Sequence, residues 1–148
     1  MIRRRGARAM GWGAAALAAC CFGAGCRTAP RAEPELVLYL FAGSSCPECR
    51  VLKEDVFPRV LPAYGGLVEY RHVAVDNAET FKLLRLYERA CGDTSPAPVK
   101  LFIGRQCLAG LETIRRRLGP VIDEELLQGH RTPAPDEVRR AAAEAPAP

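Results

Sequence analysis

The stretch LVLYLFAGSSCPECR, residues 36–50, carries the strongest fold signal in the chain. Its first seven residues form a continuous apolar, aromatic-rich run of strand length, which is typical of a strand buried inside a sheet. Residues 43–45 then turn the chain. A helix is expected to begin at Cys46, because Pro47 stands near the first-turn position, where a missing N–H costs least. The stretch therefore predicts a buried strand that leads directly into a helix carrying Cys46 and Cys49.

Strand and helix signals alternate through the rest of the domain. The first helix should bend or stop at Pro58, and Asp76 with Glu79 forms a capping-box pattern that starts the second helix, which should end at Gly92. Further strands are expected over residues 67–75, 99–103 and 107–109, and further helical segments over residues 111–118 and 121–127, interrupted by Gly119 and Pro120. The order is β-α-β, α, β-β-α, which predicts one α/β domain over residues 36–128.

Both ends of the chain differ from this domain in composition. Residues 1–19 combine a basic start with an uncharged Ala/Gly-rich run, as in a secretory signal peptide. The run ends in Leu-Ala-Ala-Cys20, which resembles a bacterial lipobox and predicts lipidation of Cys20; Cys26 is the alternative. Residues 20–35 would then be a lipidated tether. Residues 129–148 are rich in Pro and Ala without an apolar stripe, which predicts a disordered tail.

The charge balance excludes one class of partner. The arginines at positions 3, 4, 5 and 8 account for four of the 21 basic residues, and the 17 that remain equal the 17 acidic residues. A nucleic-acid-binding domain needs a basic surface that survives in the folded part. We therefore expect no nucleic-acid partner.

The motif Cys46-Pro47-Glu48-Cys49 is the candidate reactive site. Its spacing brings two sulfurs within bonding reach across one turn of helix, and the amino end of a helix stabilises a thiolate. Cys46, at the start of the helix, is expected to attack a substrate disulfide. Cys49, one turn inside, would resolve the mixed disulfide that results.

At this point the chain resembles the thioredoxin-like superfamily over roughly residues 36–127. Three features carry the resemblance: the CPEC motif between strand and helix, Ala97-Pro98-Val99 before the third strand, and the hairpin FIGRQCLAG. The resemblance implies a three-layer sandwich around a four-stranded mixed sheet with β-α-β and β-β-α halves. It also implies that Pro98 is a cis-proline opposite the cysteines, with Pro96 as the alternative, and that Ala97 and Val99 help to form the substrate groove.

The chain departs from thioredoxin in ways that affect the site. Leu40 stands where thioredoxin keeps a buried Asp that helps to move the proton of the second cysteine, so Cys49 needs another acceptor, for which Glu48 or a water could serve. Glu48 should disfavour the Cys46 thiolate, and Arg50 partly offsets that charge. Together with Pro47, these residues are expected to tune the motif toward a less aggressive oxidant than a protein with His inside it.

The remaining cysteines and histidines leave alternatives open. A lone CxxC without a second CxxC or CxxH does not make a zinc site, and Arg50 stands where covalent haem attachment needs His. His72 is interpreted as a strand residue and His130 as a solvated one, so we expect no metal site and no cofactor. Cys91 and Cys107 form either a structural disulfide or two buried thiols.

These observations predict an enzyme: a membrane-anchored thiol–disulfide oxidoreductase outside the cytoplasm that exchanges disulfides with exported cysteine-containing proteins. Reductase, oxidase and isomerase activity all stay open as its direction. Its location would be the cell envelope, facing the periplasm and anchored by lipid. Its electrons would be exchanged with a membrane redox partner, and we expect a monomer. The alternative is a non-catalytic thioredoxin-like module for binding or for copper delivery.

Overall fold

The structure is a computed structural model that describes residues 33–145. The expected signal peptide, the lipidation site at Cys20 or Cys26 and nearly all of the tether lie outside these residues. The elements, in chain order, are β1 (Leu36–Ala42), α1 (Pro47–Val51), the π-helical turn η1 (Leu52–Val56), α2 (Phe57–Val60), the 3-10 segment η2 (Leu61–Leu67), β2 (Val68–Ala74), α3 (Ala78–Cys91), β3 (Val99–Ile103), β4 (Gln106–Ala109), α4 (Leu111–Leu127) and α5 (Pro135–Glu144).

The four strands form one mixed sheet in the order β2-β1-β3-β4. β1 pairs with β2 in parallel and with β3 antiparallel, and β3 and β4 form an antiparallel hairpin. β1 and β3 are therefore the inner strands, which explains why their sequences are almost wholly apolar. The predicted α/β architecture with a four-stranded mixed sheet is confirmed.

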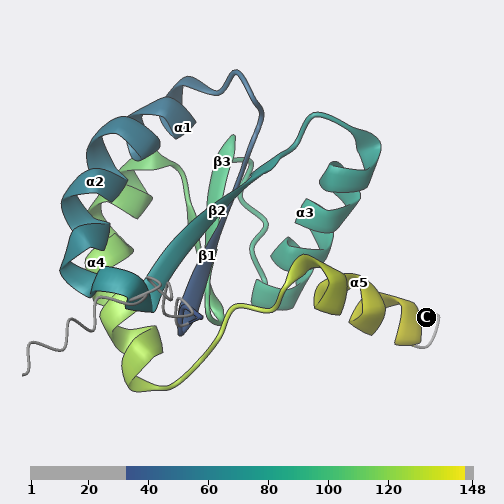
Figure 1. Cartoon of the computed structure of the whole chain (residues 1–148). Helices are drawn as coiled ribbons and strands as arrows, with labels where there is room; N and C mark the ends of the chain where they lie inside the picture. Colours follow the sequence, from purple (N-terminus) through teal and green to yellow (C-terminus); the bar gives the residue numbers. More distant parts are fainter. Residues whose placement is uncertain (1–32, 146–148) are drawn as a thin grey trace, which may run out of the picture. The chain divides into compact units, whose positions relative to one another are not determined.

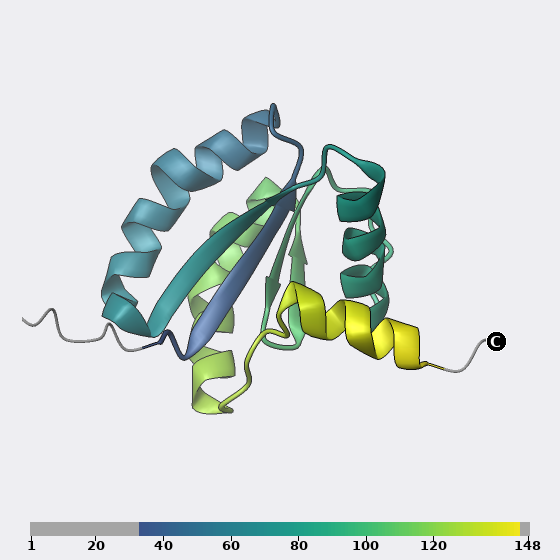
Figure 2. The same ribbon diagram turned by 45° about the vertical axis from the view of Figure 1, so that its right-hand side comes forward.

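Helices cover both faces of the sheet (Figures 1 and 2), with α1, α2 and α4 on one face and α3 and α5 on the other. Alternate β1 side chains divide between two cores. Leu36, Leu38 and Leu40 pack against the α1–α2 and α4 side, whereas Tyr39 and Phe41 pack against the α3 side. Full burial of one Leu contributes about 2 kcal/mol to stability. Because β1 buries large side chains on both faces of the sheet, it stabilises the packing of helices on either side.

The first helical run does not stop at Pro58 but changes its winding. The segment Leu52–Val56 is a π-helical turn, and the Phe57 N–H donates to the carbonyl of Leu52, five residues back. A proline has no N–H and its ring clashes with the carbonyl four residues earlier, so a wider turn upstream accommodates Pro58. The helical run therefore continues from Pro47 to Val60.

Two other local predictions are wrong. The cap of α3 is Asn77, whose Oδ1 accepts a hydrogen bond from the Thr80 N–H at 3.0 Å, and not Asp76 with Glu79. Helix α4 runs through Pro120 without a break. Val121 and Ile122 beyond that proline are almost fully buried, and their burial offsets the roughly 3 kcal/mol that an interior proline costs.

The prediction of a disordered tail is wrong for residues 129–145. Thr132 is buried and accepts a hydrogen bond from the Gly104 N–H at 2.7 Å, while the Tyr87 hydroxyl donates to the Pro133 carbonyl. His130, expected to be solvated, lies 3.1 Å from the buried carboxylate of Glu125. The tail lacks a long apolar stripe because these few polar contacts, rather than a broad apolar face, attach it to the domain.

None of the helices within residues 33–145 combines the length and the hydropathy that crossing a membrane requires.

Candidate functional site

The two cysteines of the CPEC motif lie where the sequence predicted, at the end of the central strand β1 and the start of the helical run. Cys46 is the N-cap of α1 and Pro47 is its first residue. The Cys46 N–H donates to the Gly43 carbonyl at 3.1 Å, which closes the turn between strand and helix. Both cysteines are free thiols, Cys46 half-buried and Cys49 buried. The more accessible sulfur is therefore the first one.

A pocket of about 220 Å³ opens beside the two thiols. Its walls come from the turn after β1 and from one side of the helical run: Ser44, Ser45, Cys46, Cys49, Arg50, Lys53 and Glu54. The rim is polar and carries charges of both signs. Because Cys46 and Cys49 both line this pocket, a molecule that enters it would contact the two thiols.

His72 lies behind Cys49. The Nε2 atom of His72 is 3.8 Å from the Cys49 Sγ and 3.3 Å from the Ala42 carbonyl oxygen. The Nζ atom of Lys53 lies 3.0 Å from the other ring nitrogen, Nδ1. A lysine ammonium only donates, so Nδ1 accepts and Nε2 carries the proton. His72 therefore presents an N–H to the carbonyl of Ala42 and to the sulfur of Cys49.

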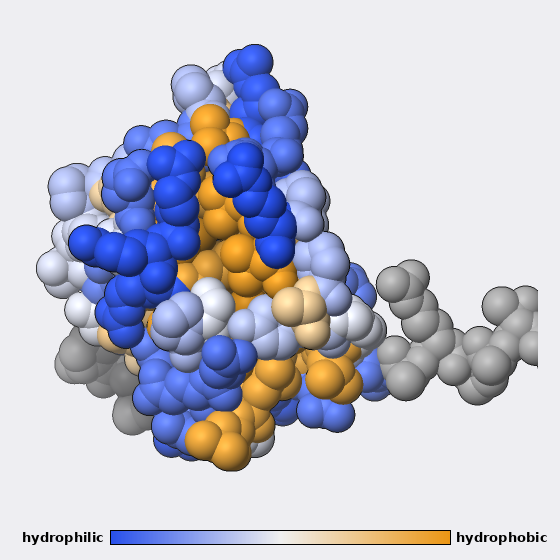
Figure 3. Space-filling view, turned by 90° about the vertical axis from the view of Figure 1, so that its left-hand side faces the viewer, coloured by the Kyte–Doolittle hydropathy of each residue, from blue (hydrophilic) through white to orange (hydrophobic). Residues whose placement is uncertain are grey.

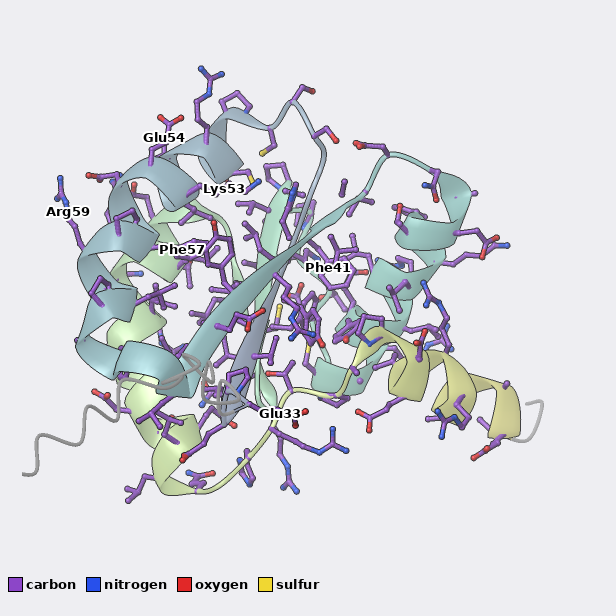
Figure 4. The ribbon with its side chains drawn as sticks, viewed as in Figure 1. Glu33, Phe41, Lys53, Glu54, Phe57 and Arg59 are labelled. Carbon is purple, nitrogen blue, oxygen red and sulfur yellow. The ribbon has the colours of Figure 1, made fainter. Side chains whose placement is uncertain are left out.

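Sheet register explains why these groups meet. His72 pairs with Leu40 in the parallel β1–β2 ladder, so its side chain leaves the sheet on the same face as that of Leu40. Lys53 follows Cys49 by one helical turn, so it lies on the same side of the helix. Figure 4 shows Lys53 and Phe57 pointing from the helical run toward the sheet, whereas Glu54 and Arg59 point away from it.

The surroundings change how both groups titrate. Burial raises the pKa of the Cys49 thiol above its ordinary value, and the Lys53 ammonium acts against this through its charge and its hydrogen bond. Burial, followed by the charge of Lys53, lowers the pKa of His72, while the Ala42 carbonyl acts in the opposite direction. At neutral pH, Cys49 is therefore mainly a thiol, His72 a neutral donor and Lys53 the cation of the site.

Asp76 holds the turn that precedes Cys46. The Ser44 N–H donates to Asp76 Oδ1 at 2.9 Å, and the Ser44 hydroxyl donates to the other carboxylate oxygen. These hydrogen bonds lower the pKa of Asp76. The turn after β1 is thus tied to the end of β2, a role that takes Asp76 away from the expected helix cap.

Glu48 makes a contact that the sequence did not indicate, whereas Arg50 lies beside the cysteine pair as expected. Glu48 Oε2 accepts a hydrogen bond at 3.3 Å from the Leu111 N–H, in the first turn of α4. Gly110, the N-cap of that helix, has no side chain to do this. Arg50 is exposed on the wall of the pocket. His72 and Lys53, and not Glu48, are the polar side chains that face Cys49.

Pro98 lies at the same end of the sheet as the motif, because Val99 pairs with Ala42, the last residue of β1. Pro98 and Pro96 are exposed and Ala97 is half-buried. Val99 is fully buried and its carbonyl accepts a hydrogen bond from Gly110, so the Val99 side chain does not line a groove. This segment does not contribute to the walls of the pocket beside the cysteines.

Sequence reasoning missed His72 and Lys53. Each carried a usable signal: His72 follows Val68 and Tyr70 at the two-residue spacing that puts alternate residues on one face, and Lys53 stands four residues after Cys49. What the sequence did not supply was the parallel register between β1 and β2, which places His72 beside the start of the first helix. Cys91 and Cys107 lie on the other face of the sheet and are not part of this site.

An apolar depression of about 320 Å³ continues from the cysteine pocket, and Lys53 lines both. It lies between the first helical run and the edge strand β2, and its apolar walls are Phe57, Pro58, Leu61, Pro62, Val68 and Tyr70. Figure 3 views the side of the molecule that carries the first helical run and shows hydrophobic residues gathered between hydrophilic ones. The surface next to the two thiols thus offers both polar and apolar contacts.

Comparisons of the chain with protein-family models, curated proteins and solved structures found no match. Within the described part of the chain, no group of three or more His, Cys, Asp or Glu side chains is arranged to hold a metal ion.

Proposed function

We propose that this chain is a thiol–disulfide oxidoreductase of thioredoxin-like fold that exchanges disulfides with polypeptides through Cys46 and Cys49. The observation that carries the proposal is the pairing of an accessible thiol at the start of a helix with a buried thiol one turn inside it, beside a cation. A structural cysteine pair has no need of that difference in access, whereas disulfide exchange does.

The reaction follows from this difference. The Cys46 thiolate attacks one sulfur of a substrate disulfide, forms a mixed disulfide and releases the first substrate thiol. Cys49 then attacks the Cys46 sulfur and releases the second substrate thiol, to which the Cys49 proton is finally transferred. Two electrons pass from the cysteine pair to the substrate. In the reverse direction the oxidised pair takes two electrons from a substrate dithiol.

Lys53 and His72 act on the second step. Cys49 becomes an attacking thiolate inside a buried site, where an unpaired negative charge is costly. The Lys53 charge and the Nε2–H of His72, 3.8 Å from the sulfur, stabilise that negative charge. Unlike the buried carboxylate that thioredoxin keeps at the position of Leu40, they stabilise the Cys49 thiolate and do not accept its proton.

The thioredoxin-like part of the proposal is supported by topology. The parallel β1–β2 pair and the antiparallel β3–β4 hairpin, followed by α4, give the β-α-β and β-β-α halves that the resemblance implies. Pro98 stands at the start of β3, at the sheet end that carries Cys46. We assign Pro98 and the backbone of Ala97 to substrate binding on this basis.

Location and partners follow from the first 26 residues of the sequence. A signal peptide and a lipidated Cys20, or Cys26, would hold the domain on the outer side of a membrane, where cysteine-containing exported proteins are its substrates. A membrane redox protein would restore the starting state of the cysteine pair.

Copper delivery is the alternative function, and the site argues against it. A cuprous ion held by Cys46, Cys49 and His72 would need Nε2 of His72 without its proton. The Lys53 ammonium on Nδ1 favours the opposite tautomer and adds a positive charge next to the ion.

Disulfide exchange with a model polypeptide tests the proposal. The wild-type chain should reduce the disulfides of that polypeptide in the presence of a small dithiol, and Cys46→Ser should lose this activity. Both proteins are made with Cys20, Cys21, Cys26, Cys91 and Cys107 replaced by serine, so that no other thiol takes part, and the matched control that keeps Cys46 and Cys49 should retain the activity. Exchange that survives Cys46→Ser would refute the enzyme, and stoichiometric copper binding by the wild type would favour the alternative.

A further inference from the structure

A second pair of cysteines lies on the face of the sheet opposite to the CPEC site. Cys91 is the last residue of α3 and Cys107 lies in β4. Both pack against the cluster formed by Tyr39, Phe41, Leu83, Tyr87 and Phe102, whereas Cys49 belongs to the core on the other side. The sheet therefore separates the two pairs, and neither can pass a disulfide to the other within one molecule.

Packing between α3 and the hairpin brings the two thiols together. The rings of Tyr87 and Phe102 contact each other with centroids 5.0 Å apart. Cys91 follows Tyr87 by one helical turn, and Cys107 pairs with Phe102 across the β3–β4 ladder. Both cysteines are partly buried against the same aromatic cluster, and burial, followed by the neighbouring Cys91, raises the pKa of Cys107.

Both thiols are half-buried, but they differ in their contact with a cavity. Cys91 lines an open cavity of about 450 Å³ between α3, the hairpin and the segment that leads into α5, together with Phe102, Arg105, Thr132 and other residues. Cys107 is not part of its lining. A disulfide that enters this cavity would therefore contact Cys91, which leaves Cys107 to act as the resolving thiol.

We propose that Cys91 and Cys107 are a second dithiol–disulfide couple, which closes to a disulfide outside the cytoplasm and ties the end of α3 to β4. Cys91 attacks a small-molecule or protein disulfide and releases one thiol. Cys107 then attacks the Cys91 sulfur and releases the second thiol. The protein loses two electrons and two protons, and the incoming disulfide gains them. This inference does not depend on the function of Cys46 and Cys49.

The test uses the full chain with Cys20, Cys21, Cys26, Cys46 and Cys49 replaced by serine, equilibrated with glutathione disulfide. We expect an internal Cys91–Cys107 disulfide, seen as a loss of two mass units and of both alkylatable thiols and as one cross-linked peptide after proteolysis. Reduction with dithiothreitol should then lower the melting temperature by about 10 °C. The disulfide closes the loop between residues 91 and 107 and so restricts the unfolded chain, which stabilises the folded protein.

Two further variants test the order of attack. With Cys107→Ser added, Cys91 should keep one glutathione, because nothing resolves the mixed disulfide. With Cys91→Ser added, Cys107 should remain a free thiol, and dithiothreitol should leave the melting temperature unchanged. Two free thiols at equilibrium, glutathione on both cysteines without an internal bond, or equal melting temperatures of the oxidised and reduced forms would overturn the inference.

Discussion

The Nε2 atom of His72 lies 3.8 Å from the Sγ atom of Cys49, although 22 residues separate them in the sequence. The contact joins the second strand of the sheet to the first turn of the helix after β1. Lys53, 3.0 Å from the other nitrogen of the same ring, completes a line from a cation through a neutral imidazole to a buried thiol. Among the described side chains, Lys53 and His72 are therefore the groups that we expect to control the ionisation of Cys49.

The first prediction concerns the charge of Lys53. Lys53→Gln keeps a donor for His72 but removes the charge, so the pKa of Cys49 should rise further. Each unit of that rise lowers the thiolate fraction about tenfold, so Cys49 should attack the mixed disulfide several-fold to tenfold more slowly at pH 7.

That step can be followed directly. In a chain whose cysteines other than Cys46 and Cys49 are serine, one equivalent of an aromatic disulfide releases a coloured thiol twice, and the second release reports the attack by Cys49. Arg59→Gln is the matched control, since it makes the same charge change on the same helical run with a side chain that points outward (Figure 4). Equal slowing by both variants would contradict the prediction, because Lys53 would then act only through the net charge of the protein and not through its position next to Cys49.

The second prediction is the pH profile of the same step. An ordinary thiol titrates near pH 9.0, and burial raises the pKa of Cys49 above this value. The second release should therefore become about tenfold faster per pH unit from pH 6 to pH 8 without a plateau. Because the pKa of His72 is lowered from its ordinary 6.5, no inflection should appear near that pH. A plateau below pH 8 would contradict the assignment.

The third prediction concerns the stability of the face that carries α3. Lys100 and Glu88 form an ion pair in which the side chains are only 3% and 5% exposed, and Lys100 also contacts Asp93. Lys100→Met should lower the free energy of unfolding by about 3 kcal/mol, because it removes the buried cation of the cluster and leaves the carboxylate of Glu88 with only the more exposed Arg85 as its partner. Lys82→Met removes a cation from the exposed pair with Glu79 and should cost less than about 1 kcal/mol. Denaturant titrations of the two variants measure the difference, and equal losses would refute it.

The same ion pair sets the direction of its pH dependence. Burial lowers the pKa of Lys100, but its bonds to Asp93 and Glu88 outweigh this and raise the pKa above 10.5. The pKa of Asp93 is lowered below 3.8, since its bonds to Lys100 and Ser95 outweigh its burial. The contribution of Lys100 is thus complete below pH 10.5 and is lost as the pH rises further. That of Asp93 is complete above pH 3.8 and is lost as the pH falls. The two lysine variants should therefore differ most between these limits.

Much of the architecture could be predicted because its signals are local. The apolar run of β1, the proline after Cys46 and the glycine after α3 each determine a short segment by themselves. The predictions failed where tertiary contacts outweighed local preference. Pro120 stays inside α4 because Val121 and Ile122 beyond it are buried, and residues 129–145 are held by Thr132 and Tyr87 through single hydrogen bonds.

The positions of Cys46 and Cys49 could also be predicted, but the side chains around them could not. Cys46 and Cys49 are neighbours in sequence, and helix geometry alone relates them. The position of His72 depends on the register between two parallel strands separated by a helix, which no short stretch of sequence determines. The same applies to Glu48, whose contact with the start of α4 bridges 63 positions in the sequence.

The most direct test of the central claim is to trap the mixed disulfide. With Cys49→Ser, the intermediate formed by Cys46 cannot be resolved, so incubation with a disulfide-bonded polypeptide should produce a covalent adduct that maps to Cys46 and disappears on reduction. Cys46→Ser should form no adduct at Cys49, because that thiol is buried. An adduct on Cys49 in that second variant, or none on Cys46 in the first, would contradict the account.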